Sequence, residues 1–142
     1  MSLIGETQPQ AAGDLIKDGT DASFIADVIE ASKETPVIVD FWATWCGPCR
    51  QFAPIFEKSA EDNPEIVHGK LDTEAARRVA AAAGITAIPT LMAFREGVIV
   101  FNQAGALPAP ALAEIVAGVK KLDMKDVHAD IAAQNDKSVP EQ

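Results

Sequence analysis

A run of apolar residues, many of them β-branched or aromatic, spans Val37–Ala43 and leads through Thr44 into Trp-Cys-Gly-Pro-Cys at positions 45–49. A short apolar run of this kind, bounded by turn residues, is typical of a strand that is buried on both faces. Apolar residues then recur at helical spacing, and proline is tolerated in the first turn of a helix because the N–H groups there have no intrahelical acceptor. The sequence therefore predicts a buried strand, a sharp turn and a helix that begins at the cysteine pair.

The rest of the chain alternates between helical and strand periodicity. The predicted helices cover residues 21–33, 73–83 and 110–122 besides the one at the cysteines, and the predicted strands cover residues 37–43, 66–72, 90–94 and 98–102. A preceding strand at Leu15-Ile16 is too short to assign. Strands that alternate with helices pair in parallel, and the hairpin of the last two strands adds antiparallel pairing at one edge. We therefore expect a single α/β domain with a central mixed β-sheet flanked by helices.

The acidic composition limits the classes of partner. The 142 residues carry 21 acidic and 12 basic side chains, a formal net charge of −9. Nucleic acid and anionic membrane are disfavoured as partners, because binding to phosphate needs a basic surface. No segment approaches the roughly 20 apolar residues of a membrane span, and the first residues lack the basic and apolar regions of a signal peptide. We expect a monomer in the cytoplasm.

Two cysteines in the whole chain, spaced Cys-x-x-Cys, exclude a secreted disulfide scaffold, which carries several pairs. A zinc site needs four ligands, and neither His68 nor His128 lies at a finger-like spacing from the cysteines. We expect both histidines at the surface or at a sheet edge. The prediction is no metal and no bound cofactor, with a reversible Cys46–Cys49 disulfide as the redox centre.

Cys46 is the predicted nucleophile. A thiol at a helix N-terminus is surrounded by unpaired N–H groups and the positive end of the helix dipole, which favour the thiolate. Cys49 lies three residues on, on the same helix face, so the two sulfurs can bond with little backbone movement. Thiolate Cys46 would attack a disulfide of another protein, and Cys49 would then attack Cys46 and release the reduced partner.

Asp40 is the candidate proton acceptor for Cys49. It is the only charged residue in an otherwise apolar strand, so burial should raise its pKa toward neutrality, which suits a proton shuttle. The alternative is a buried carboxylate that is satisfied by hydrogen bonds and has no catalytic part.

Residues 37–54 closely resemble the active site of the thioredoxin family, which carries the same Trp-Cys-Gly-Pro-Cys sequence, and the similarity covers roughly residues 14–122. The resemblance implies a thioredoxin fold and a general protein-disulfide reductase that is re-reduced by a flavin-dependent thioredoxin reductase. Gly47 and Pro48 between the cysteines favour the reducing end of the family, since oxidases and isomerases usually carry a histidine there.

The resemblance also assigns roles to residues outside the cysteine pair. It places Ile88 and Pro89 in the family's cis-proline loop, which faces the disulfide and pairs with the substrate strand, and Gly105 and Ala106 at the border of the docking groove. Trp45, beside the nucleophile, is expected both to support the active site and to contact the substrate. The other residues expected to support the site are Trp42 beneath it, Gly47, Pro48, Lys70 next to Asp40, and Pro54, which kinks the helix.

The two ends of the chain depart from the short typical form of the family. We divide the chain into an N-terminal extension, residues 1–13, the thioredoxin domain, residues 14–122, and a C-terminal extension, residues 123–142. The last segment is predicted to form a short helix, with Met124, Val127, His128 and Ile131 on one face, followed by a disordered tail beyond Gln134. We favour packing of this helix on its own domain over binding to a partner.

Three other functions remain open at this point. An oxidase or isomerase of the same fold would use the same cysteines. A binding or chaperone-like module would keep its activity when both cysteines are replaced by serine. A metal site shared between two chains would contain stoichiometric metal, and Cys46→Ser would remove it.

Overall fold

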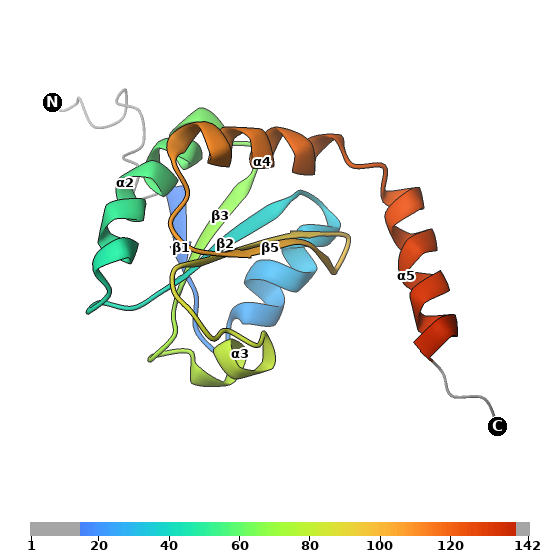
Figure 1. Cartoon of the computed structure of the whole chain (residues 1–142), viewed down its shortest axis with the longest axis horizontal. Helices are drawn as coiled ribbons and strands as arrows, with labels where there is room; N and C mark the ends of the chain where they lie inside the picture. The colour runs from blue at the N-terminus through green and yellow to red at the C-terminus, as the bar shows by residue number, and fades with distance from the viewer. Residues whose placement is uncertain (1–14, 139–142) are drawn as a thin grey trace, which may run out of the picture.

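A five-stranded mixed sheet organises the protein (Figure 1), and the computed structural model describes residues 15–138. The strands are β1 (Ile16–Asp18), β2 (Val37–Trp42), β3 (Val67–Asp72), β4 (Thr90–Arg95) and β5 (Val98–Ala104). The helices are η2 (Ile25–Glu30), η3 (Ala31–Lys33), α2 (Gly47–Asp62), α3 (Arg77–Ala82), α4 (Ala109–Lys121) and α5 (Met124–Ser138). The extension at residues 1–13 and the final residues 139–142 lie outside the described part of the chain.

The strand order is β1-β3-β2-β4-β5, with β2 at the centre. The strands β1, β3 and β2 run parallel, and β4 and β5 join β2 in antiparallel pairing. The turn between β4 and β5 contains Glu96 at φ 53° and Gly97 at φ 83°. Two successive residues with positive φ match the twist of a two-residue hairpin. The predicted mixed sheet and the predicted hairpin are both confirmed.

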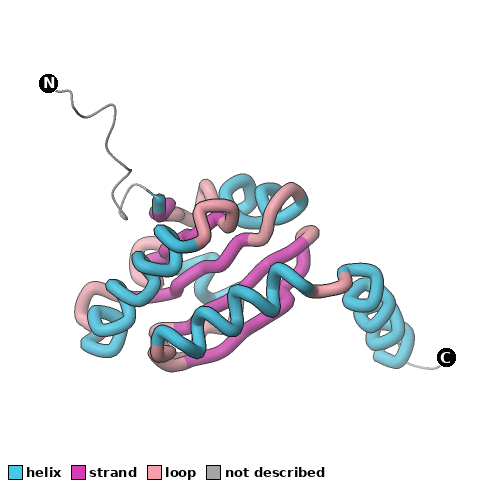
Figure 2. Tube along the Cα trace, turned by 90° about the horizontal axis from the view of Figure 1, so that it is seen from above, coloured by secondary structure: helices cyan, strands magenta, loops and turns pink. Residues whose placement is uncertain are grey.

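Helices cover both faces of the sheet, and each face has its own apolar cluster. Helices α2 and α4 lie on one face, in front of the strands in Figure 2, whereas η2 and α3 lie on the other (Figure 1). On the α2 face, Phe52 and Phe56 of α2 pack with Ile38 of β2 and with α4. On the opposite face, Val39 of β2 packs with Val28 of η2. Alternate residues of the central strand therefore contact opposite layers, as expected for a strand buried on both faces.

Two predicted helices differ from the structure in form or length. The segment 21–33 forms a π-helix and then a 3₁₀-helix, after a turn in which Thr20 and Ser23 bond to each other. The helix predicted over 73–83 is α3, which begins only at Arg77. Asp72 accepts the N–H of Glu74 with its side chain and those of the next two residues with its carbonyl, so this turn uses residues that periodicity assigned to the helix.

Helix α5 follows α4 after a short connection and extends away from the sheet in both views (Figures 1 and 2). Met124 at its start is buried, and Nε2 of His128 lies 2.8 Å from the Glu96 carboxylate in the β4–β5 turn. The helix thus contacts its own domain at Met124 and His128, while Val127 and Ile131 of the predicted face are only half-buried. It continues to Ser138, four residues beyond the point where we expected it to fray.

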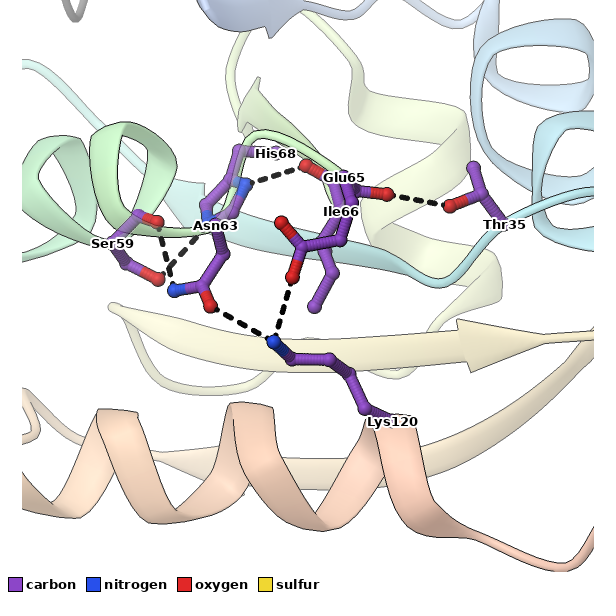
Figure 3. Close-up of polar contacts among 7 residues, drawn as sticks. All are labelled: Thr35, Ser59, Asn63, Glu65, Ile66, His68 and Lys120. Carbon is purple, nitrogen blue, oxygen red and sulfur yellow. Dashed lines mark hydrogen bonds and ion pairs between the residues drawn. The ribbon is translucent and has the colours of Figure 1, made fainter.

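The prediction for His68 is wrong, because the residue lies in the core with 1% of its surface exposed. Its Nδ1 is 3.0 Å from the carbonyl of Ile66, which can only accept, so Nδ1 carries the hydrogen. Its Nε2 therefore accepts the hydroxyl of Ser59 on α2 at 2.9 Å (Figure 3). Phe56 of α2 packs against the imidazole with the ring centroids 5.2 Å apart. Burial lowers the pKa of His68 below its ordinary value of 6.5.

The same corner ties α4 to α2 and β3. Nζ of Lys120 on α4 bonds to the Asn63 side chain at 3.2 Å and to the Glu65 carboxylate at 2.6 Å (Figure 3). The Asn63 amide in turn donates to the carbonyl of Ser59 at 3.0 Å. The corner thus carries its charges at the rim and a neutral imidazole inside.

We predict that His68 makes the fold sensitive to acid. Below pH 6.5 the unfolded chain binds a proton at His68 that the folded chain resists, so the free energy of unfolding falls with pH until the folded-state pKa is also passed. His68→Gln keeps polar groups at the site but does not titrate. The loss of stability between pH 7.5 and pH 5, measured by urea denaturation, should be smaller for this variant than for the unaltered protein.

Ser59→Ala should lower the free energy of unfolding at pH 7.5 by about 1–3 kcal/mol, because it leaves Nε2 of His68 buried without a donor. Parallel pH profiles for His68→Gln and the unaltered protein would contradict the assignment.

Candidate active site

The cysteine pair lies where β2 ends and α2 begins. The N–H of Cys46 donates to the carbonyl of Ala43 at 3.2 Å, which turns the chain, and the Cys46 carbonyl accepts the N–H of Arg50 at the start of the helix. Cys46 itself has extended backbone angles and is the N-cap residue of α2. The expected placement of Cys46 at a helix N-terminus is therefore confirmed.

Cys46 and Cys49 form a disulfide, with their Cα atoms 5.2 Å apart. The Cys49 N–H donates to Sγ of Cys46 at 3.1 Å. This N–H is one of the first-turn donors that have no partner within the helix. In the reduced protein the same donor and the helix dipole stabilise a thiolate at Cys46. Both cysteines are buried, so the disulfide presents little surface to solvent.

The loop before β4 faces this disulfide. The Ile88–Pro89 peptide bond is cis, and the carbonyl of Ile88 lies 3.8 Å from Sγ of Cys46. The Ile88 side chain packs against the cysteines. Gly105, at φ 104°, donates its N–H to the carbonyl of Pro89 at 2.8 Å, and Ala106 beside it is exposed. The structure thus places Ile88 beside the sulfur and joins Gly105 to the same loop through Pro89, with Ala106 next in the chain.

Trp45 lies at the rim of the site with 64% of its surface exposed. Its indole N–H donates to the carboxylate of Glu74 at 2.6 Å. Glu74 follows β3, and its own N–H is held by the side chain of Asp72. The large apolar ring is therefore fixed in orientation although it faces solvent.

Asp40 lies in the middle of β2 with none of its surface exposed. It points to the same side of the sheet as Ile38, two residues earlier, and so faces α2. Neither carboxylate oxygen has a hydrogen-bond partner among the protein groups of residues 15–138. Burial raises the pKa of Asp40 from 3.8 to about 7, and the positive charge of Lys70 opposes part of the rise.

Lys70 lies directly opposite Asp40 in the parallel ladder of β2 and β3. Its Nζ lies over the indole ring of Trp42, 4.5 Å from the ring centroid. Trp42 is half-buried and also packs against the cysteines. Lys70, the predicted neighbour of Asp40, thus lies opposite it, and Trp42 lies beside the cysteines as predicted.

Comparison with known proteins identifies the family. A family model described as Thioredoxin matches residues 16–118. The chain is 55% identical to putative thioredoxin 2 of Streptomyces coelicolor over 98 residues, which cover 69% of this chain and 73% of that protein. It is 44% identical to a thioredoxin of Streptomyces clavuligerus over 98 residues, 69% of this chain and 90% of that protein. The chain belongs to the thioredoxin family.

A third relative joins two functions in one polypeptide. The bifunctional thioredoxin reductase/thioredoxin of Mycobacterium leprae is 44% identical over 94 residues, which are 66% of this chain and 20% of that protein. Thioredoxins are protein-disulfide oxidoreductases that work with a thioredoxin reductase. This chain is a thiol–disulfide oxidoreductase of that kind, with the Cys46–Cys49 pair as its redox centre.

Sequence reasoning missed Glu74 as a part of this thioredoxin site. A signal was available, since parallel strands end at the same edge of a sheet, and Glu74 follows β3 as Cys46 follows β2. Within residues 15–138, no group of three or more His, Cys, Asp or Glu side chains could hold a metal ion. No helix in that range is long and apolar enough to cross a membrane.

We predict that Asp40→Asn stabilises the protein, and more so at high pH. The folded-state pKa of Asp40, about 7, lies above its unfolded value, so the folded protein is penalised increasingly as pH rises from 3.8 through 7. The variant removes this penalty. Its gain in free energy of unfolding should be larger at pH 8 than at pH 5 by roughly 2–3 kcal/mol, as measured by guanidinium denaturation of the oxidised protein.

Asp130→Asn, on the exposed surface of α5, removes the same charge and should produce no comparable gain. A constant difference between Asp40→Asn and the unaltered protein from pH 5 to pH 8 would show that Asp40 does not titrate in this range.

Proposed function

We propose that this chain acts in the cytoplasm as a monomeric, general reductant of disulfides in other proteins, and that a separate thioredoxin reductase returns it to the dithiol form. The observation that carries the proposal is the placement of Sγ of Cys46. It accepts an N–H at the start of α2 on one side and faces the carbonyl of Ile88 on the other. A thiolate in this position has an anion-stabilising site behind it and an extended binding loop in front of it.

The reaction moves two electrons in two exchange steps. The Cys46 thiolate attacks one sulfur of the partner's disulfide, a mixed disulfide forms, and the partner's other sulfur leaves as a thiolate. The Cys49 thiolate then attacks Sγ of Cys46. The second partner sulfur leaves, the partner is reduced to a dithiol, and the Cys46–Cys49 disulfide is restored.

Asp40 supplies the base for the second step. Cys49 is buried, and its thiol must lose a proton before it can attack. Asp40 lies on the sheet face beneath α2, and its pKa of about 7 allows it to accept a proton and release it again near neutral pH. We assign Lys70 a supporting role, since its charge opposes the rise in the pKa of Asp40 that burial causes.

Docking of the partner uses the loops around the disulfide. The substrate segment would lie along Ile88 and Pro89 in extended form, between Trp45 and the Gly105-Ala106 turn, with Gly47 and Pro48 beside it. Exposed apolar groups with fixed orientation, such as the Trp45 ring, suit a surface that must accept many partners.

The reduction potential of the Cys46–Cys49 couple tests the direction of electron flow. We expect a value near the −270 mV that is typical of thioredoxins, clearly more reducing than the roughly −180 mV of protein disulfide isomerase. The measurement is equilibration in dithiothreitol redox buffers, followed by Trp fluorescence. A potential at or above about −180 mV would favour the oxidase or isomerase alternative.

The two single cysteine variants should fail in different ways. Cys46→Ser removes the nucleophile and should abolish both the reduction of insulin disulfides and the formation of adducts. Cys49→Ser keeps the nucleophile but cannot resolve the mixed disulfide, so it should accumulate covalent adducts that dithiothreitol releases. Undiminished insulin reduction by either variant would rule out the proposed exchange.

A further inference from the structure

The contact between Lys70 and Trp42 has no part in the steps described above, yet it adjoins the proton acceptor. Asp40 and Trp42 lie two residues apart on β2, so both point to the α2 face. Lys70 on β3 is opposite Asp40, with its ammonium group over the Trp42 ring at 4.5 Å from the centroid. Asp40, Lys70 and Trp42 thus lie on the same face of the sheet, and the Trp42 ring holds the ammonium end of Lys70.

The Trp42 ring is in close contact with the ammonium group of Lys70. Lys70 makes no ion pair within 4.0 Å among residues 15–138, although Asp40 lies opposite it in the ladder. A lysine side chain is long and flexible, and its ammonium group is strongly hydrated, so a half-buried lysine is drawn toward solvent. Attraction to the face of an indole ring keeps the charge near the sheet.

We propose that Trp42 is a positioning residue for proton transfer, because its ring holds the Lys70 charge at the place from which it acts on Asp40. The inference rests on the proposed role of Asp40 as proton acceptor for Cys49. Without the ring, Lys70 would sample solvent, where water and salt screen its charge. The proton affinity of Asp40 would then no longer respond to Lys70.

The other groups near Asp40 are either uncharged or engaged elsewhere, so Lys70 is the charge that acts on Asp40. The β4 residue opposite Asp40 is Leu91, and α2 contributes the buried Cys49, which is in the disulfide. On β3, His68 and Asp72 flank Lys70 on the same face. His68 is bonded to Ser59 and faces the far half of α2, while Asp72 caps the turn that follows β3. Among residues 15–138, Lys70 is the one charge that shifts the pKa of Asp40.

The test is a double-mutant cycle on the oxidised protein, in which no thiol titrates. The four proteins are the unaltered chain, Lys70→Met, Trp42→Met and the double variant. With aspartate ¹³C-labelled at the carboxyl carbon, NMR follows each aspartate through pH 3–9, and Asp40→Asn assigns the resonance. Lys70→Met should raise the Asp40 midpoint in the unaltered background, and by less than half as much when Trp42 is methionine.

Trp42→Phe is the matched variant, since it keeps an aromatic face and should preserve most of the Lys70 effect. An equal effect of Lys70→Met with tryptophan and with methionine at position 42 would overturn the proposal. The comparison cancels the change in burial that Trp42→Met itself causes, because this change is present with either residue at position 70.

A second measurement needs no variant of Trp42. Protons next to Nζ of Lys70 lie over the indole ring and should be shifted upfield by its ring current, and Lys70→Met assigns their resonance. Random-coil shifts for these protons would overturn the proposal even if Trp42→Met does not fold. Both measurements use isolated oxidised protein, so they are independent of the insulin assay. Coupling without reductase activity would leave the positioning of the Lys70 charge by Trp42 standing, and would remove the proposed function together with the part of Trp42 in proton transfer.

Discussion

The change from strand to helix between Trp42 and Gly47 is the constraint on which the site depends. Strand β2 ends at Trp42, and α2 begins at Gly47, close to the carboxyl end of that strand. The free N–H groups of the first helical turn therefore surround Cys46. The disulfide, the bond from the Cys49 N–H and the approach of the Ile88 carbonyl all follow from this placement. The position of the turn is fixed at its start by β2, which is packed on both faces, and at its end by α2.

Burial of Asp40 lowers the stability of the fold, but it also raises the pKa of this carboxyl group into the range that is useful for proton transfer. An apolar side chain at this position would remove a desolvation penalty, which rises as the carboxyl ionises near pH 7. The same penalty is what brings the pKa into the range where a base can accept and release protons in each cycle. The fold tolerates the charge because the rest of β2 is apolar and packed against two layers, and because Lys70 moderates the penalty.

Contiguous or periodic patterns allowed the sequence to predict the sheet, the hairpin and the cysteine pair. The predicted strand Val37–Ala43 was within one residue of β2. The Ala-rich segment after β3 has the periodicity of a longer helix, but Asp72 fixes its first residues as a turn. The cis peptide before Pro89 came from the family resemblance, since position in the sequence alone favours trans.

Contacts between side chains from different elements could not be predicted in this way. The pattern around His68 is compatible with an edge position, and only the pairing of β3 between β1 and β2 makes it interior. Ser59 lies nine residues before His68, and the local sequence around either residue does not predict the hydrogen bond between the two side chains. The same holds for Lys70 and Trp42, whose contact depends on the register of two parallel strands that α2 separates in the chain.

The two faces of the sheet differ in whether they bury titratable side chains. Both buried titratable side chains among the described residues, Asp40 and His68, point to the face that α2 covers. The opposite face packs Val37, Val39 and Phe41 against η2 and α3 without a buried ionisable group, so its apolar contacts do not vary with pH. Stability that is independent of protonation thus comes from one layer. The layer on the α2 face holds the buried groups whose charge depends on pH.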